Sequence, residues 1–157
     1  MMKSYLLGID IGTSACKVAV FDKEGKVLAA ANGDYPVYYP QEGWAEQNPE
    51  EWWSAVCRAT KETVQKAGID PAEIAGVGID GQSWSAIALD KEGKVLTNTP
   101  IWMDTRAQDI CERLNKEIGE DKIFEVAGNS LQPSYTTAKI IWYRENKPEV
   151  YEKIYKI

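Results

Sequence analysis

The strongest constraint on this chain is the stretch of residues 7–22, in which two apolar runs flank a short polar turn. The first run carries an acid, Asp10, which we expect to be buried, and the turn consists of Gly12, Thr13 and Ser14. Apolar runs on both sides of a glycine-containing turn are typical of a β-hairpin. The pattern therefore predicts a hairpin whose turn carries chemically useful groups.

This turn offers the groups that bind phosphate. Small residues let a phosphate approach backbone N–H groups, while hydroxyls and a cation offset its charge. Gly12, Thr13, Ser14 and Lys17 supply these groups, and Asp10 is a suitable ligand for a hydrated Mg²⁺ ion. The spacing is not that of a Walker loop. An ordinary hairpin with a polar turn is the alternative for this stretch taken alone.

The composition narrows the class of protein. A chain of 157 residues with 44% hydrophobic and 27% charged residues suits one soluble domain. Its net charge of −6, without a Lys/Arg cluster, argues against nucleic acid or an anionic membrane as partner. Because the sequence shows neither a transmembrane segment nor a signal peptide, we expect a cytoplasmic protein.

The cysteines and histidines limit the chemistry further. Cys16, Cys57 and Cys111 are widely spaced, so we expect reduced thiols that pack as small apolar groups. Histidine is absent, which excludes His-based triads and His general bases. A proton acceptor in this protein must therefore be a carboxylate or a less usual group.

Strands and helices follow from periodicity and from start and stop residues. Strands are predicted over residues 4–11, 15–22, 26–35 and 74–79, and another begins at 154–157. Helices are predicted from Pro49 to a stop at Gly68, from Thr105 to a stop at Gly119, and over 120–127, 136–146 and 148–153. Residues 36–47 are expected to form an irregular loop.

This order of elements predicts an α/β or α+β domain. The first three strands should be antiparallel and the later ones parallel, giving a mixed sheet flanked by helices. The heptapeptide of residues 22–28 recurs unchanged at 90–96. It indicates a second use of the same hairpin geometry, or a coincidence of good turn chemistry.

Two further segments place polar groups beside an aromatic residue after an apolar strand, where open sheets bind ligands. Their candidate residues are Gln82, Ser83, Trp84, Trp102, Asp104 and Arg106. A sugar suits such a site, because amides, acids and guanidinium groups bind its hydroxyls and an indole packs on its C–H face. Alternatively, Asp104 caps the helix from Thr105 and Arg106 pairs with a surface acid.

Together these segments resemble the FGGY family of carbohydrate kinases, particularly its xylulokinase-like members, over essentially the whole chain. The matching motifs are Asp10-x-Gly12-Thr13-Ser14-x-x-Lys17, Gly43-Trp44-Ala45-Glu46-Gln47 with Asn48-Pro49 and Trp52-Trp53, Gly81-Gln82, Trp102-x-Asp104-x-Arg106, and Gly128-Asn129 leading to Lys139 and Trp142.

The resemblance implies a ribonuclease H-like half-domain of the actin/hexokinase superfamily, with residues 1–157 as the kinase N-terminal domain. It implies ATP and Mg²⁺ as cofactors and transfer of the γ-phosphoryl group to a hydroxyl of a ketose such as xylulose. In the family, Asp10, Gly12, Thr13, Ser14 and Lys17 would hold the nucleotide phosphates, with Asp10 at the metal. Gln82, Ser83, Trp84, Trp102, Asp104 and Arg106 would line the sugar pocket.

The chain departs from the family pattern in two respects. Xylulokinases typically carry Met-His after Gly-Gln, whereas this chain has Ser83-Trp84, which leaves a pentulose, gluconate or a related polyol open as substrate. The general base, the adenosine pocket and the second lobe are expected beyond Ile157. The chain is therefore predicted to be an N-terminal fragment, inactive alone, of a protein about three times its length.

Other functions fit the same residues. The chain could be a sugar- or nucleotide-binding module that needs a separate second half. An actin-like assembly protein fits less well, since it would not need the polar and aromatic groups at Trp84 and Trp102. An uncovered sheet edge and apolar face should favour self-association, including a homodimer.

Overall fold

The structure is a computed structural model that describes residues 4–157. Within these residues the chain forms two compact units. Unit 1 consists of residues 4–37 and 50–82, and unit 2 of residues 38–49 and 83–157. Each unit is thus built from two separate stretches of the chain.

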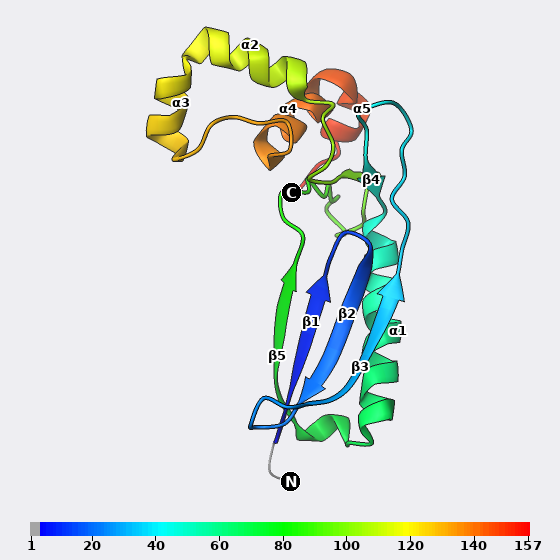
Figure 1. Cartoon of the computed structure of the whole chain (residues 1–157). Helices are drawn as coiled ribbons and strands as arrows, with labels where there is room; N and C mark the ends of the chain where they lie inside the picture. The colour runs from blue at the N-terminus through cyan, green and yellow to red at the C-terminus, as the bar shows by residue number, and fades with distance from the viewer. Residues whose placement is uncertain (1–3) are drawn as a thin grey trace. The chain divides into compact units, whose positions relative to one another are not determined.

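Unit 1 contains a mixed four-stranded sheet in the order β3-β2-β1-β5 (Figure 1). Its strands are β1 (Tyr5–Ile11), β2 (Ala15–Phe21), β3 (Val27–Asp34) and β5 (Ile74–Gly81). β1 pairs antiparallel with β2 and parallel with β5, while β2 pairs antiparallel with β3. The predicted mixed sheet is therefore confirmed, with its strands close to the expected positions.

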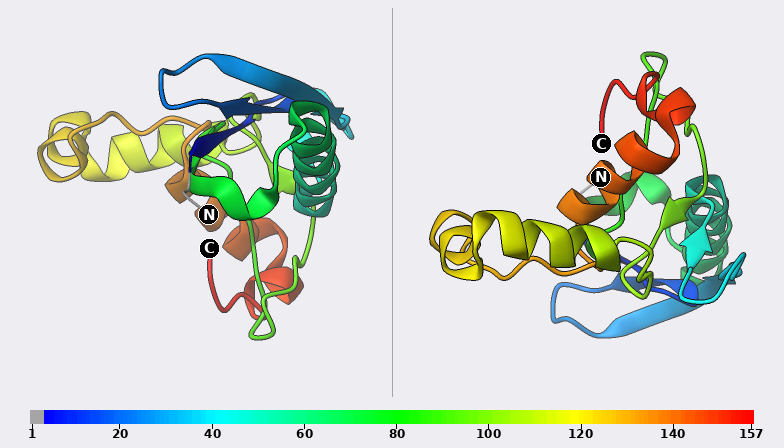
Figure 2. Two further views of the ribbon diagram at one scale, coloured as in Figure 1. Left: turned by 90° about the horizontal axis from the view of Figure 1, so that it is seen from below. Right: turned by 90° about the horizontal axis from the view of Figure 1, so that it is seen from above.

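Helix α1 (Pro49–Ala67) lies along one face of this sheet (Figures 1 and 2). Cys16, Val18 and Val20 alternate along β2 and are fully or almost fully buried, because every second side chain of a strand points to the same face. Contact with the helix is close at Gly33 of β3, where a Cβ atom would lie 2.8 Å from the carbonyl oxygen of Ala55. A short 3₁₀ helix, Pro71–Glu73, precedes β5.

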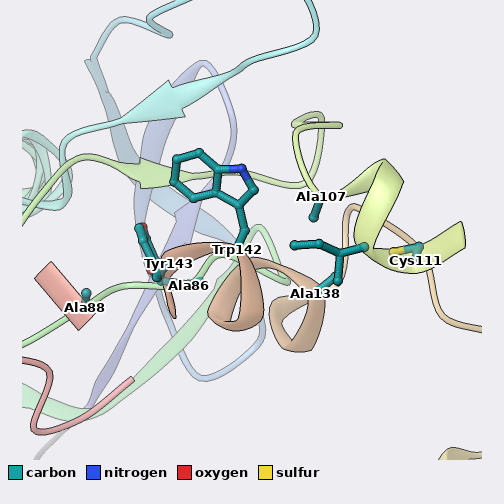
Figure 3. Close-up of a cluster of buried hydrophobic side chains, with 8 residues drawn as sticks. Ala86, Ala88, Ala107, Cys111, Ala138, Trp142 and Tyr143 are labelled. Carbon is teal, nitrogen blue, oxygen red and sulfur yellow. The ribbon is translucent and has the colours of Figure 1, made fainter. Parts of the chain in front are cut away.

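Unit 2 has short strands and four helices. The strands β4 (Glu46–Gln47) and β6 (Thr99–Pro100) pair antiparallel. The helices are α2 (Gln108–Ile118), α3 (Glu120–Ala127), α4 (Thr136–Asn146) and α5 (Pro148–Tyr151). Its core gathers Trp142 and Tyr143 of α4 against small side chains (Figure 3). These small residues include Ala86, Ala88, Ala107, Cys111 and Ala138.

Four local predictions are wrong. Helix α2 begins at Gln108 rather than Thr105, because the Thr105 hydroxyl donates to the carbonyl of Gly43 at 3.0 Å. The expected loop of residues 36–47 ends in strand β4. In place of a strand over residues 154–157, Lys156 makes an isolated bridge to Leu89. Cys57 is exposed, whereas Cys16 and Cys111 are buried as expected.

The repeated heptapeptide forms the same turn twice. The Oδ1 atom of each leading aspartate accepts the N–H groups two and four residues later, at 3.1 and 2.8 Å for Asp22 and at 3.0 and 2.8 Å for Asp90. The second turn connects Leu89 and Val95, which form an isolated bridge rather than two long strands. The prediction is confirmed for the turn itself.

Strand β5 forms an edge of the sheet with large exposed apolar side chains, among them Val77 and Ile79 at 56% and 72% exposure. Such an edge is compatible with the predicted self-association, which stays a prediction. Across residues 4–157, no helix has the length and apolar character needed to cross a membrane.

The contact between β3 and α1 can be tested with Gly33→Ala. The added Cβ would press on the Ala55 carbonyl at 2.8 Å, so we expect the free energy of unfolding to fall by about 1–3 kcal/mol. Gly78→Ala in the same sheet is the matched control, because no atom lies within 4 Å of its added Cβ. Urea denaturation followed by circular dichroism gives both values, and equal losses would contradict the assigned contact.

Candidate functional site

The candidate phosphate turn, Gly12–Ser14, connects β1 to β2 as predicted. It is closed by a hydrogen bond from the Gly12 N–H to the Ala15 carbonyl at 3.1 Å. A Cβ atom at Gly12 would lie 3.2 Å from that carbonyl oxygen, closer than an ordinary contact. A larger residue at Gly12 would require this carbonyl to shift by a few tenths of an ångström. Ser14 and Lys17 beside the turn are exposed.

Tyr35 supports this turn and was missed by the sequence reasoning. Its hydroxyl donates to the Gly12 carbonyl, and its ring packs on Trp52 of α1 with centroids 6.5 Å apart. Burial raises the pKa of Tyr35, so the phenol is protonated and acts as a donor at neutral pH. No local pattern could reveal this contact, since Tyr35 lies 23 residues after Gly12.

Asp10 is not buried as expected, since its side chain is 44% exposed. The Lys17 ammonium lies 3.3 Å from its Oδ2 atom and is itself 66% exposed. Asp80 of β5 pairs in register with Asp10, and all three residues line a concavity of about 600 Å³ in unit 1. Asp80 is thus a second carboxylate near the turn, and it was not among the candidate residues.

The donor set around Asp10 fits a hydrated Mg²⁺ ion better than a fully protein-ligated metal. Within residues 4–157 there is no group of three or more His, Cys, Asp or Glu side chains placed to hold a metal. Mg²⁺ usually keeps several waters and takes one or two carboxylates, and Asp10, with Asp80 nearby, supplies that number of carboxylates.

The second candidate segment begins where β5 ends. The Gln82 N–H donates to the Ile11 carbonyl at 2.8 Å, and Gly81 allows this approach because a Cβ there would lie 2.8 Å from the same oxygen. Gln82 belongs to unit 1, whereas Ser83 and Trp84 belong to unit 2. The six predicted sugar residues are therefore divided between the two units.

Trp84 has an unusual backbone conformation. Its φ of 67° is the only positive value among the non-glycine residues that the structure describes. Such a conformation costs about 1–3 kcal/mol and persists only where surrounding contacts hold it. The indole is 50% exposed, and its centroid lies 4.9 Å from that of Tyr135, a residue missed by sequence reasoning.

Asp104 and Arg106, in contrast, are buried inside unit 2. The Asp104 carboxylate accepts the Arg106 Nε and Nη2 groups at 2.8 Å each and the Ala45 N–H at 2.7 Å. Arg106 also pairs with the buried Glu46 at 2.8 Å. The alternative in which Arg106 meets a surface acid is therefore wrong. Asp104 also accepts the Arg106 backbone N–H at 3.0 Å, as a capping side chain would, but the helix begins only at Gln108.

Two tryptophans complete the surroundings of Arg106. Its Cζ atom lies 3.8 Å from the Trp44 ring centroid and 4.8 Å from that of Trp142. A weakly hydrated guanidinium group stacks well on aromatic rings. The charge is thus enclosed by both acids and π systems, which suits a residue that holds a loop in place.

Of the predicted sugar residues in unit 2, Ser83, Trp84 and Trp102 are exposed, Trp102 at 44%. Asp104 and Arg106 follow Trp102 by two and four residues, and their side chains are buried. Direct contact with a sugar stays a prediction for all of these residues.

This chain is similar in sequence and structure to known proteins. The model of the FGGY family of carbohydrate kinases, N-terminal domain, matches residues 5–157. A glycerol kinase of Thermococcus kodakarensis is 34% identical over 155 residues, covering 99% of this chain and 31% of that protein. A xylulose kinase of Bacillus subtilis is 34% identical over 149 residues, covering 95% of this chain and 30% of that protein.

A ligand-bound xylulose kinase from Lactobacillus acidophilus has a similar structure, with a TM-score of 0.89 and 30% identity. The match covers 97% of this chain and 30% of that one. A gluconate kinase from the same species gives a TM-score of 0.88 at 29% identity, covering 96% and 30% of the two chains. The chain spans about a third of the length of the relatives it matches.

The buried cluster around Arg106 can be tested with Asp104→Ala. Removal of one partner leaves a buried charge poorly compensated, so we expect a loss of about 3–5 kcal/mol in the free energy of unfolding. Asp10→Ala is the matched control, because its ion pair with Lys17 is exposed and worth about 0–1 kcal/mol. Guanidinium denaturation of both variants should show this difference, and similar losses would refute the structural role of Asp104.

Proposed function

The chain belongs to the FGGY family of carbohydrate kinases, and on that premise we propose that it carries the phosphate turn and the acceptor residues of an ATP-dependent sugar kinase. The reaction is transfer of the γ-phosphoryl group of ATP to a hydroxyl of a ketose such as xylulose. The observation that carries the proposal is the Gly12–Ser14 turn between β1 and β2, flanked by Asp10 and Lys17.

The donor half of the reaction is assigned to unit 1. Phosphoryl transfer depends mainly on positioning and on neutralising charge. The exposed ammonium group of Lys17 is able to leave Asp10 for a phosphate oxygen, and the turn offers the Thr13 and Ser14 hydroxyls. Asp10 would hold Mg²⁺, which when bound would offset the negative charge of the phosphates. Tyr35 would keep the turn in its binding geometry.

The acceptor half is assigned to unit 2. The exposed indoles of Trp84 and Trp102 provide apolar surfaces for the C–H face of a sugar, and the Ser83 hydroxyl provides a polar contact. Asp104 and Arg106 act in this proposal mainly by fixing the loop of Trp102. Gln82, at the end of unit 1, directly precedes Ser83 in the chain, and its contact with a sugar stays a prediction of the family resemblance.

The choice of a ketose rests on these two exposed indoles, because the relatives do not decide it. Similar proteins named xylulose kinase and glycerol kinase are equally identical to this chain, at 34%. Two exposed indoles offer more apolar surface than a three-carbon polyol can cover, which favours a larger acceptor. The second candidate function is a sugar- or nucleotide-binding module that gains turnover only with a separate second half.

Calorimetric titration of the chain tests the acceptor assignment. With xylulose, other pentuloses, gluconate and glycerol as ligands, we expect saturable binding of one ketose. Trp102→Ala should weaken it about tenfold, equal to about 1.4 kcal/mol. Trp53→Ala is the control, because that indole is 66% exposed on α1 and has no assigned role. If no panel member binds, or if Trp53→Ala weakens binding as much, the acceptor assignment fails.

The donor assignment has a separate test. Asp10→Ala should weaken binding of Mg²⁺-ATP and leave the affinity for the sugar unchanged, because the residue contacts only the metal and phosphates in the proposal. Titration with ATP in the presence and absence of Mg²⁺ provides the measurement. An unchanged Mg²⁺-ATP affinity in this variant would remove Asp10 from the site.

Turnover separates the kinase from the binding module. We expect the purified 157-residue chain to bind its ligands without measurable phosphorylation, because the general base is proposed to lie in the part of the relatives that it does not span. A coupled assay of ADP release checks this expectation. Phosphorylation of any ketose by this chain alone would contradict it.

A further inference from the structure

Lys139 of α4 is fully buried, and among residues 4–157 its hydrogen bonds go to backbone carbonyls and none goes to a carboxylate. Its ammonium group donates to three such carbonyls. The acceptors are the carbonyls of Trp84 and Ile101, each at 2.8 Å, and that of Ser134. Three chain segments that are distant in sequence therefore meet at one nitrogen atom.

Each of these carbonyls belongs to a peptide group of an aromatic residue. The first is the carbonyl of Trp84 itself. The Ile101 carbonyl is part of the peptide bond that leads into Trp102, and the Ser134 carbonyl is part of the bond that leads into Tyr135. The Trp84 and Tyr135 rings are in contact, with centroids 4.9 Å apart. Through these hydrogen bonds, the ammonium group fixes the backbone beside three aromatic side chains.

We propose that Lys139 is a positioning residue, which fixes the aromatic side chains of Trp84, Trp102 and Tyr135 as the walls of the acceptor subsite. The inference rests on the proposed function for the identity of the ligand. The positioning itself rests only on the contacts of unit 2. Lys139 touches neither substrate nor phosphate in this proposal and acts through the three peptide groups.

The chemistry of the lysine side chain suits this role. An ammonium group has three N–H donors in a tetrahedral arrangement and no acceptor, so three carbonyls use its full capacity. The planar guanidinium of arginine directs its donors in a fork and cannot converge on three carbonyls from one atom. The positive φ of Trp84 also needs a contact to hold it, and the hydrogen bond from Lys139 to its carbonyl provides one.

The surroundings make the protonation of Lys139 sensitive to pH. Burial lowers its pKa to about 8, and Arg106 lowers it as well, whereas the negative charge of Asp104 raises it. A neutral amine has only two N–H donors for three carbonyls. Deprotonation near pH 8 should therefore release one of the three segments.

The test compares Lys139→Met with Tyr143→Phe as a matched control. Methionine keeps most of the length of the side chain, without the terminal nitrogen, and donates no hydrogen bond. Tyr143 lies one turn further along the same helix, is equally buried and donates to the Ala86 carbonyl at 3.2 Å. Removal of the Tyr143 hydroxyl takes a buried donor from α4 and leaves the hydrogen bonds of Lys139 to the three carbonyls in place.

Indole N–H signals in ¹H–¹⁵N spectra report the outcome directly, with assignments from Trp84→Phe and Trp102→Phe. In Lys139→Met the signals of Trp84 and Trp102 should shift or broaden, while those of Trp52 and Trp53 in unit 1 stay in place. In Tyr143→Phe all of these signals should stay in place. Unmoved Trp84 and Trp102 signals in Lys139→Met, or equal changes in both variants, would overturn the proposal.

Ligand affinity separates this proposal from the proposed function. In calorimetry, Lys139→Met should bind the ketose about tenfold more weakly and Mg²⁺-ATP with unchanged affinity. If the unchanged protein binds no sugar, the acceptor function fails while the indole spectra still decide the positioning role. If the sugar binds and Lys139→Met binds it equally well, the positioning proposal fails.

A titration of the unchanged protein covers the case in which Lys139→Met does not fold. Raising the pH through about 8 should move the Trp84 and Trp102 indole signals together, with one midpoint. Trp52 and Trp53 should show no transition at that midpoint. A titration in which Trp84 and Trp102 do not move would contradict the proposal.

Discussion

Unit 2 depends on the burial of Arg106 between two acids and two indoles. Its partners come from both stretches of chain that form this unit: Glu46 and Trp44 from the first, and Asp104 and Trp142 from the second. Burial of a charge is costly unless its partners and hydrogen bonds are well placed, and the forked pairing with Asp104 meets this condition. With Lys139, the unit buries two acidic and two basic side chains, whose formal charges cancel.

In unit 1, too, a polar contact fixes the backbone next to exposed groups. The Gly12–Ser14 turn, in which Ser14 is exposed, is held by the hydrogen bond from the Tyr35 hydroxyl. The exposed Trp102 lies two residues before the buried Asp104, which accepts the Ala45 N–H. In both units the groups available to a ligand are exposed, and polar contacts beneath them fix the backbone. In the proposed function, a site arranged in this way would bind with little reorganisation, which suits a reaction that depends on positioning.

Local features of the sequence predicted most of the elements. The apolar run after the Gly12–Ser14 turn predicted β2, and the structure shows that its buried face is formed by Cys16, Val18 and Val20 at every second position. Pro49 and Gly68 marked the limits of α1. The repeated heptapeptide indicated the same turn at Asp22 and Asp90, because the contacts of that turn span only four residues.

The wrong predictions concern residues whose structure depends on contacts with distant parts of the chain. Thr105 looked like a helix start, but its hydroxyl binds Gly43, which lies 62 residues earlier. Strand β4 has two residues and pairs with a strand of the same length more than 50 residues later, so no periodicity could reveal it. Asp10 was expected to be buried because it follows an apolar run, but its face of the sheet is lined by an open concavity.

By itself, the sequence determined the mixed sheet, the helices and the resemblance to FGGY kinases, because periodicity, caps and motifs lie within short segments. Only the tertiary structure decided the contacts of Asp104, Arg106 and Lys139. Asp104 meets Ala45 across 59 residues, and Lys139 meets Trp84 across 55. A buried charge is stabilised only by partners that folding brings to it, so neither its burial nor its role can be inferred from its neighbours in the chain.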